Sequence, residues 1–169
     1  MKYDLLIFDL DGTLVDSADD IAESIQQLYR ETEREVPQKA PIIAAIGDGV
    51  RTLIERTTTP PYEGLLEKFL PIYERRCLRQ SKLYPGVQRT LEELPGRKTI
   101  LSNKPEGLCQ KMVTDLGIGS HFEGIFGGDS FPIRKPNPKV IQNILQQHPA
   151  EKPILIGDSK VDVQTALEA

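Results

Sequence analysis

Two aspartates with the spacing to share one chemical task, Asp9 and Asp11, directly follow the apolar run Leu5–Phe8. Four consecutive apolar residues predict a strand buried on both faces, as in a parallel sheet. Residues two apart on a strand point the same way, so we expect both carboxylates at its carboxyl end, where open α/β sheets bind ligands. Gly12 allows a sharp turn there. Two neighbouring carboxylates require a cation or a shared proton, although a simple polar turn is the alternative for this stretch alone.

Further polar residues follow three later apolar runs: Ser102 and Asn103 after residues 99–101, Lys135 in the loop after residues 125–126, and Asp158 after residues 153–156. The carboxyl ends of parallel strands lie on one edge of a sheet, so these side chains are expected to converge. Carboxylates without histidine or cysteine at zinc spacing suit Mg²⁺. A hydroxyl, an ammonium and free backbone N–H groups suit a phosphate.

The elements that position these residues follow a simple order. Strands and helices alternate over residues 81–169, which predicts βαβ units and a parallel sheet. Residues 15–80 show only helical patterns, with helices beginning near Ser17, Pro41, Val50 and Leu65. The predicted fold is therefore α/β: a Rossmann-like parallel-sheet core, residues 1–14 and 81–169, with an inserted all-helical cap domain, residues 15–80.

The composition of the chain limits the kinds of partner that we expect. The chain of 169 residues has a net charge of −4 and no long Lys/Arg cluster, so we expect no nucleic-acid partner. No apolar run approaches the roughly 20 residues that cross a bilayer, and no signal peptide is evident at Lys2. Cys77 and Cys109 are expected to be buried free thiols in a reducing cytoplasm. We expect a cytoplasmic monomer or homodimer, and the polar groups at the strand ends suit a small phosphorylated metabolite as its partner.

Four ordered motifs resemble those of haloacid dehalogenase superfamily phosphatases: Asp9-Leu10-Asp11-Gly12-Thr13, Ser102-Asn103, Lys135 with Pro136 and Pro138, and Gly157-Asp158-Ser159 with Asp162. The resemblance covers almost the whole chain. Within the superfamily the chain is most similar to phosphoglycolate phosphatases, through residues 16–21, 102–105 and 127–132.

The resemblance implies a role for each motif residue. Asp9 is expected to attack phosphorus and form an aspartyl-phosphate, and Asp11 to protonate the leaving oxygen and then activate water. Mg²⁺ is expected to bind the carboxylates of Asp9 and Asp158 and the backbone carbonyl of Asp11. Ser102 is expected to hold phosphate oxygens, and Lys135 to offset negative charge.

Other residues are implied to assist. The expected substrate contacts are Gly12, Thr13, Ser102, Asn103 and Lys104, together with Arg51 in the insert. Asp162 is expected to hold Lys135 or a metal-bound water from behind, with Ser159 beside it. The turn at residues 46–50, followed by a helix, favours an anionic substrate tail such as the carboxylate of phosphoglycolate, although a plain helix–helix turn is equally compatible.

Alternatives stay open at this point. The substrate could instead be pyrophosphate, a nucleotide or a sugar phosphate, and a catalytically silent phosphate-binding or regulatory module is a function of a different class. Members of the family continue past the fourth motif with a further strand and helix, so we expect the core to be truncated at its C-terminal end. A longer natural chain, or lower stability because residues 154–156 form an edge strand, would follow.

Overall fold

The computed structural model describes residues 2–169 and divides into two compact units. The first comprises the chain up to Val15 together with Leu83–Ala169, and the second comprises Asp16–Lys82. No helix within residues 2–169 combines the length and the apolar character that a membrane crossing requires.

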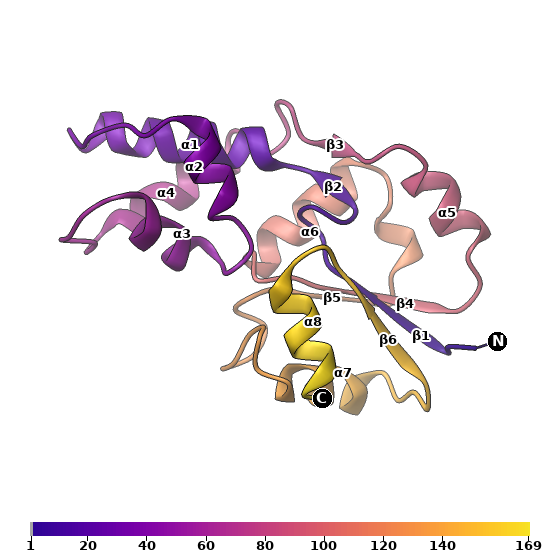
Figure 1. The fold of residues 1–169 in the computed structure, drawn as a ribbon. Helices are drawn as coiled ribbons and strands as arrows, with labels where there is room; N and C mark the ends of the chain where they lie inside the picture. Colours follow the sequence, from indigo (N-terminus) through magenta and orange to yellow (C-terminus); the bar gives the residue numbers. More distant parts are fainter. Residues whose placement is uncertain (1) are drawn as a thin grey trace. The chain divides into compact units, whose positions relative to one another are not determined.

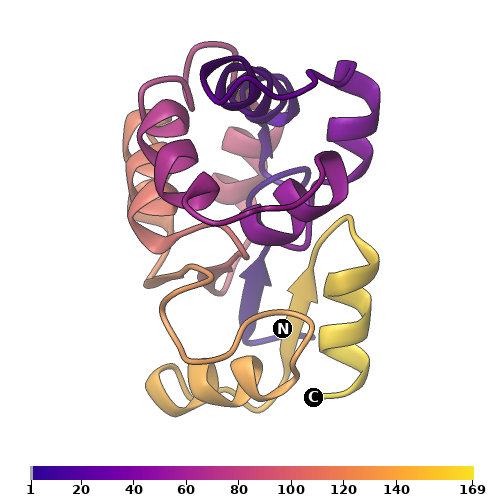
Figure 2. The ribbon, with the colours of Figure 1, turned by 90° about the vertical axis from the view of Figure 1, so that its left-hand side faces the viewer.

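The first unit is built on a four-stranded parallel sheet in the order β5-β4-β1-β6 (Figure 1). Its strands are β1 (Leu5–Phe8), β4 (Arg97–Leu101), β5 (Gly124–Phe126) and β6 (Pro153–Ile156). β1 is central and buried at every residue, as its uninterrupted apolar sequence predicts. Figure 2 shows β1 and β6 side by side, and their pairing sets Phe8 opposite Ile156. The predicted α/β fold with a parallel sheet is confirmed.

Helices cover both faces of this sheet. They are α5 (Val87–Glu93), α6 (Glu106–Asp115), α7 (Lys139–Gln147) and α8 (Lys160–Leu167), with a short 3₁₀ turn at Gly119–His121. In Figure 1, α5 and α6 lie on one side of the strands and α7 and α8 on the other. Leu5 and Ile7 alternate toward α7, where they join a buried cluster with Val140 and Ile144. This packing fixes the strand ends that carry the motif residues.

The second unit is helical, with α1 (Ala18–Glu31), α2 (Lys39–Ala44), α3 (Val50–Thr57) and α4 (Leu65–Glu74). Its core contains the fully buried Ile25, Leu28 and Tyr29 of α1, and the stacked rings of Phe69 and Tyr73 of α4. These residues recur at three- and four-residue spacing, which explains why the helices were predictable.

Two-residue strands mark the points where the chain passes from one unit to the other. β2 (Val15–Asp16) pairs with β3 (Lys82–Leu83), and neither strand was predicted because two residues carry no periodicity. Within the second unit, the buried Asp20 of α1 accepts hydrogen bonds from the backbone N–H groups of Gln80 and Ser81. Asp20 thereby holds the returning chain next to the start of α1.

Candidate active site

Asp9 follows the last residue of β1 and remains tied to the sheet, because its N–H donates to the carbonyl of Ile156 at 2.8 Å. Its side chain is buried, and its Oδ1 accepts from the N–H of Leu10 at 2.8 Å. Beyond it the chain turns tightly, with Gly12 at φ +85° and its N–H donating to Val15 O. A positive φ is a conformation that glycine adopts without steric cost.

Lys135 brings a buried ammonium to Asp9 from the loop between β5 and α7. Its Nζ lies 3.0 Å from Asp9 Oδ1 and 2.5 Å from Asp162 Oδ1. The second oxygen of Asp162 accepts from the N–H of Ser159 at 3.1 Å and from its Oγ at 2.5 Å, in a capping box at the start of α8. One oxygen of Asp162 thus binds Lys135 and the other binds Ser159, so Asp162 is held in place and fixes the orientation of the Lys135 ammonium.

The electrostatics of this pair follow from burial and mutual attraction. Burial raises the pKa of Asp9 to about 6, and the Lys135 ammonium opposes that rise without cancelling it. Burial disfavours the charged form of Lys135, but Asp9 and Asp162 together outweigh it and raise the pKa of Lys135. Lys135 is therefore a cation throughout the neutral pH range, placed beside a carboxyl group whose pKa burial raises to about 6.

The loop after β4 contributes Ser102, Asn103 and Lys104, all buried. The N–H of Ser102 donates to Phe126 O at 2.9 Å, and Asn103 Nδ2 donates to the backbone carbonyl of Lys135 at 3.0 Å. Asn103 therefore connects this loop to the segment that carries Lys135. A Cβ at Gly128 would lie 2.5 Å from Asn103 O, so only glycine lets the loop after β5 approach so closely.

Lys104 extends across the loop to Asp11. Its Nζ lies 2.6 Å from Asp11 Oδ1, and both side chains are largely buried, at 4% and 14% exposed. Sequence reasoning placed both residues at the site but did not predict this pair, since two residues on separate loops give no sequence signal of contact.

Asp158 follows β6 and reaches the loop after Asp9. Its Oδ1 accepts from Thr13 Oγ1 at 3.0 Å, and a Cβ at Gly12 would lie 2.3 Å from its Oδ2. Asp9, Asp158 and Asp162 each offer a carboxylate oxygen within 4.8 Å of the others. Because Asp162 is occupied by Lys135 and Ser159, Asp9 and Asp158 are the carboxylates that could share a cation. An all-oxygen set fits Mg²⁺.

The structure also gives the positions of Arg51 and Asp129. Arg51 is exposed on α3 in the second unit. Asp129, in the loop after β5, accepts from the N–H of Glu106 at 2.7 Å at the start of α6. The remaining expected site residues lie together in the first unit.

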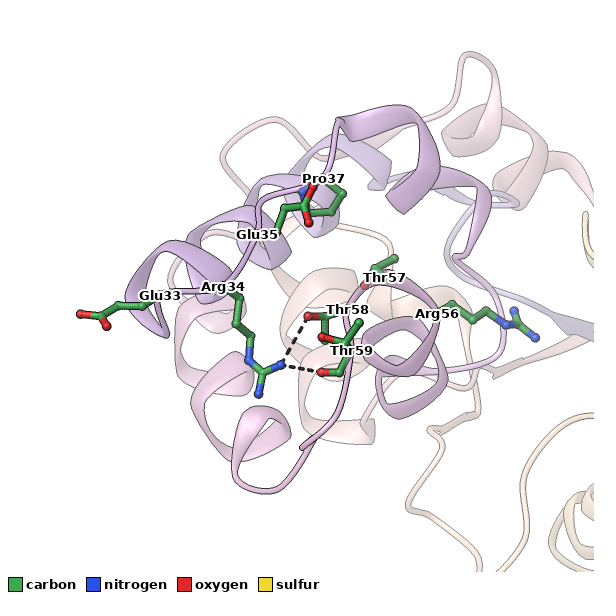
Figure 3. A pocket seen from close by; sticks show the side chains of 8 residues that line it. All are labelled: Glu33, Arg34, Glu35, Pro37, Arg56, Thr57, Thr58 and Thr59. Carbon is green, nitrogen blue, oxygen red and sulfur yellow. Dashed lines mark hydrogen bonds between the residues drawn. The ribbon is translucent and has the colours of Figure 1, made fainter.

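The second unit has a pocket of its own, shown in Figure 3. It is lined by residues 33–35, 37 and 56–59. The Arg34 guanidinium donates to Thr59 O at 2.6 Å and also contacts Thr58 Oγ1 and Pro61 O. These bonds hold the loop after α3 to the segment after α1, so Arg34 has a structural role here.

Comparison with known proteins identifies relatives along nearly the whole chain. A family profile described as haloacid dehalogenase-like hydrolase matches residues 6–169. The phosphoglycolate phosphatase of Aquifex aeolicus is 34% identical over 172 residues, covering 98% of this chain and 80% of that protein. The phosphoglycolate phosphatase of Pseudomonas syringae pv. tomato is 31% identical over 98% of this chain and 66% of its own length. The chain thus spans about two thirds to four fifths of these relatives.

Solved structures of haloacid dehalogenase-like proteins and phosphatases also match nearly the whole chain. The crystal structure of a predicted phosphoglycolate phosphatase from Haemophilus somnus matches with a TM-score of 0.93 and 27% identity, over 100% of this chain and 83% of that one. A haloacid dehalogenase-like family hydrolase from Streptococcus pneumoniae matches with a TM-score of 0.87 and 29% identity, over 99% of this chain and 81% of its own. The chain belongs to the haloacid dehalogenase-like hydrolases, among their phosphatases.

Proposed function

We propose that this chain hydrolyses a phosphomonoester, with Mg²⁺ as cofactor and an aspartyl-phosphate on Asp9 as intermediate, and that 2-phosphoglycolate is the substrate. The observation that carries the proposal is the buried Asp9 carboxylate, 3.0 Å from the Lys135 ammonium and close to Asp158. The curated relatives named phosphoglycolate phosphatase support the choice of substrate. We expect the enzyme to act in the cytoplasm as a monomer or homodimer.

In this mechanism Asp9 attacks phosphorus, and the alcohol oxygen leaves on the opposite side. Leu10 N–H and Lys135 fix the orientation of the Asp9 carboxylate before the attack. Asp11 protonates the leaving oxygen and then takes a proton from the water that hydrolyses the aspartyl-phosphate. Asp11 thus regains, when the aspartyl-phosphate is hydrolysed, the proton that it gave to the leaving oxygen.

The remaining groups stabilise charge. Ser102 and neighbouring backbone N–H groups hold phosphoryl oxygens, and Lys135 offsets the negative charge between Asp9 and the phosphoryl group. Asp9, Asp158 and the Asp11 carbonyl would hold Mg²⁺, which neutralises charge on the phosphoryl oxygens when bound. We assign the helical unit, residues 16–82, as the cap that covers the substrate, with Arg51 as its candidate contact.

Phosphate release from a substrate panel tests this proposal. The panel contains 2-phosphoglycolate, a sugar phosphate, a nucleotide and pyrophosphate, each with Mg²⁺ or with a chelator. Asp9→Asn should abolish release, whereas the matched control Asp115→Asn, at an exposed position on α6, should retain it. A wild type no faster than Asp9→Asn would indicate a silent phosphate-binding module. Higher kcat/KM for another ester would overturn 2-phosphoglycolate.

A further inference from the structure

The loop after β4 is short, and the structure shows what holds each of its ends. At its start, the N–H of Ser102 donates to the carbonyl of Phe126 in β5 at 2.9 Å. At its end, α6 begins after Pro105, which provides no side-chain cap for the helix. The first N–H groups of a helix have no partner within the helix, so a local Ser, Thr, Asp or Asn often accepts from one of them. The start of α6 therefore needs a partner from elsewhere in the fold.

The loop after β5 supplies that partner. Asp129 Oδ1 accepts from the N–H of Glu106 at 2.7 Å, and so caps α6 from 23 residues further along the chain. Beside it, Ser130 Oγ accepts from the N–H of Gly127 at 2.7 Å and donates to Glu106 Oε2 at 2.5 Å. The other carboxylate oxygen of Glu106 accepts from Gln110 Nε2 at 2.7 Å. We call the three residues Glu106, Asp129 and Ser130 the clasp.

The two loops also contact each other beside the clasp. The carbonyl of Lys104 accepts from the N–H of Gly128 at 2.8 Å, and a Cβ at Gly128 would lie 2.5 Å from Asn103 O. A Cβ at Gly127 would collide with the backbone of Glu106, so only glycine permits this approach. The conformation of the loop after β4 is therefore set by its contact with the loop after β5.

These contacts connect the clasp to the groups that hold the phosphoryl oxygens in the proposed reaction. Ser102 lies in the loop after β4, directly before the residues that the loop after β5 contacts. The loop after β5 continues to Lys135, whose backbone carbonyl accepts from Asn103 Nδ2 at 3.0 Å. Asp9 and Asp158, which could share a cation, follow two other strands, β1 and β6. The clasp thus lies on the phosphoryl side of the site.

We propose that Asp129 and Ser130 are positioning residues for phosphoryl binding, and that they act through Glu106. The clasp fixes the loop that carries Ser102 relative to the segment that carries Lys135. This inference rests on the proposed function, in which both of those side chains act on the phosphoryl group. Groups that bind a reacting phosphoryl must be placed closely, and a displacement of about 1 Å can lower the rate roughly 100-fold. Loss of the clasp therefore weakens phosphoryl binding and leaves cation binding intact.

The test measures two affinities of the double variant Asp129→Ala with Ser130→Ala. Calorimetric titration gives the affinity for inorganic phosphate in the presence of Mg²⁺, and the affinity for Mg²⁺ in the absence of phosphate. The phosphate affinity should fall roughly 10-fold or more, together with kcat/KM for 2-phosphoglycolate, because the phosphoryl-binding groups are displaced. The Mg²⁺ affinity should equal that of wild type.

Asp4→Ala is the matched control for loss of a carboxylate that accepts from backbone N–H groups. Asp4 accepts from the N–H groups of Glu151 and Lys152, both at 2.8 Å, and it precedes β1, at the end of the strand away from the site. This control should lose stability but keep the phosphate affinity of wild type. Asp129→Asn retains an oxygen that can accept from the N–H at the start of α6, so it should keep most of the phosphate affinity.

A phosphate affinity in the double variant that falls no more than in Asp4→Ala would overturn the inference. An equal loss of Mg²⁺ affinity would overturn it too, because it would show a general loosening of the fold. If a thermal melt shows that the double variant does not fold, the single variants Asp129→Ala and Ser130→Ala give the same comparison. A wild type that hydrolyses 2-phosphoglycolate no faster than Asp9→Asn would overturn the proposed function instead, and phosphate affinity would still test the clasp.

Discussion

Lys135 Nζ lies 3.0 Å from Asp9 Oδ1, with both side chains buried. Asp162 contacts the same ammonium, with its Oδ1 2.5 Å from Lys135 Nζ. One cation thus separates two buried carboxylates, so we expect the stability of this part of the fold to depend on Lys135.

Replacing Lys135 with Met should destabilise the fold and impair catalysis. Two buried carboxylates would face each other without the ammonium, and breaking a buried ion pair costs about 3–5 kcal/mol. Loss of a charge-stabilising group should also lower kcat roughly 100-fold or more. Urea unfolding and phosphate-release kinetics measure the two effects. If Lys135→Met unfolded at the same urea concentration as wild type, the predicted contribution of Lys135 to stability would be contradicted.

The pH dependence of stability should carry the signature of Asp9. Without metal, its pKa is about 6 in the folded protein and near 3.8 when unfolded, so folding favours the protonated form. The stabilisation from that form is complete below about pH 4 and is lost as pH rises through 6, by about 3 kcal/mol at most.

Asp9→Asn lacks this titration and provides the comparison. The difference in free energy of unfolding between Asp9→Asn and wild type, measured in chelator, should shift in favour of the variant between pH 4 and 7. Added Mg²⁺ should diminish the shift, since a bound cation favours the ionised carboxylate. A difference that stays constant with pH would show that Asp9 ionises normally.

Gly12→Ala tests the close approach of Asp158 to the loop after Asp9. The new Cβ would lie 2.3 Å from Asp158 Oδ2, so the carboxylate must move and Mg²⁺ affinity should fall roughly 10-fold or more. Gly86→Ala is the matched control, because Gly86 has a similar φ of +88° but no atom lies within 4 Å of the position that its new Cβ would take. Titration with Mg²⁺ should separate the variants, and equal affinities would refute a metal role for this contact.

Much of the fold was predictable because buried strands and helices have characteristic runs or periodic patterns of apolar residues. The run Leu5–Phe8 became β1 with the predicted bounds, and Pro153–Ile156 became β6. Parallel strands share one edge for their carboxyl ends, so the convergence of Asp9, Ser102 and Asp158 could be anticipated. The two-residue strands β2 and β3 could not, since they are too short to show alternation.

The pairing of individual side chains was less accessible. Lys104 and Asp11 meet through the exact course of two loops, and the contact of Thr13 with Asp158 depends on the turn at Gly12. Sequence motifs predict which residue types lie together at the edge of the sheet. Which ammonium faces which carboxylate is decided by packing of the loops, as at Gly128 against Asn103.

The central claim is that Asp9 carries the phosphoryl group during turnover, and mass spectrometry of acid-quenched enzyme tests it most directly. The enzyme is mixed with 2-phosphoglycolate and Mg²⁺, quenched within the first turnovers and digested. We predict a phosphoryl group on Asp9, at higher occupancy in Asp11→Asn because activation of the hydrolytic water is impaired, and none in Asp9→Asn. Phosphate release by an enzyme whose Asp9 peptide stays unmodified, or undiminished release by Asp9→Asn, would contradict the claim.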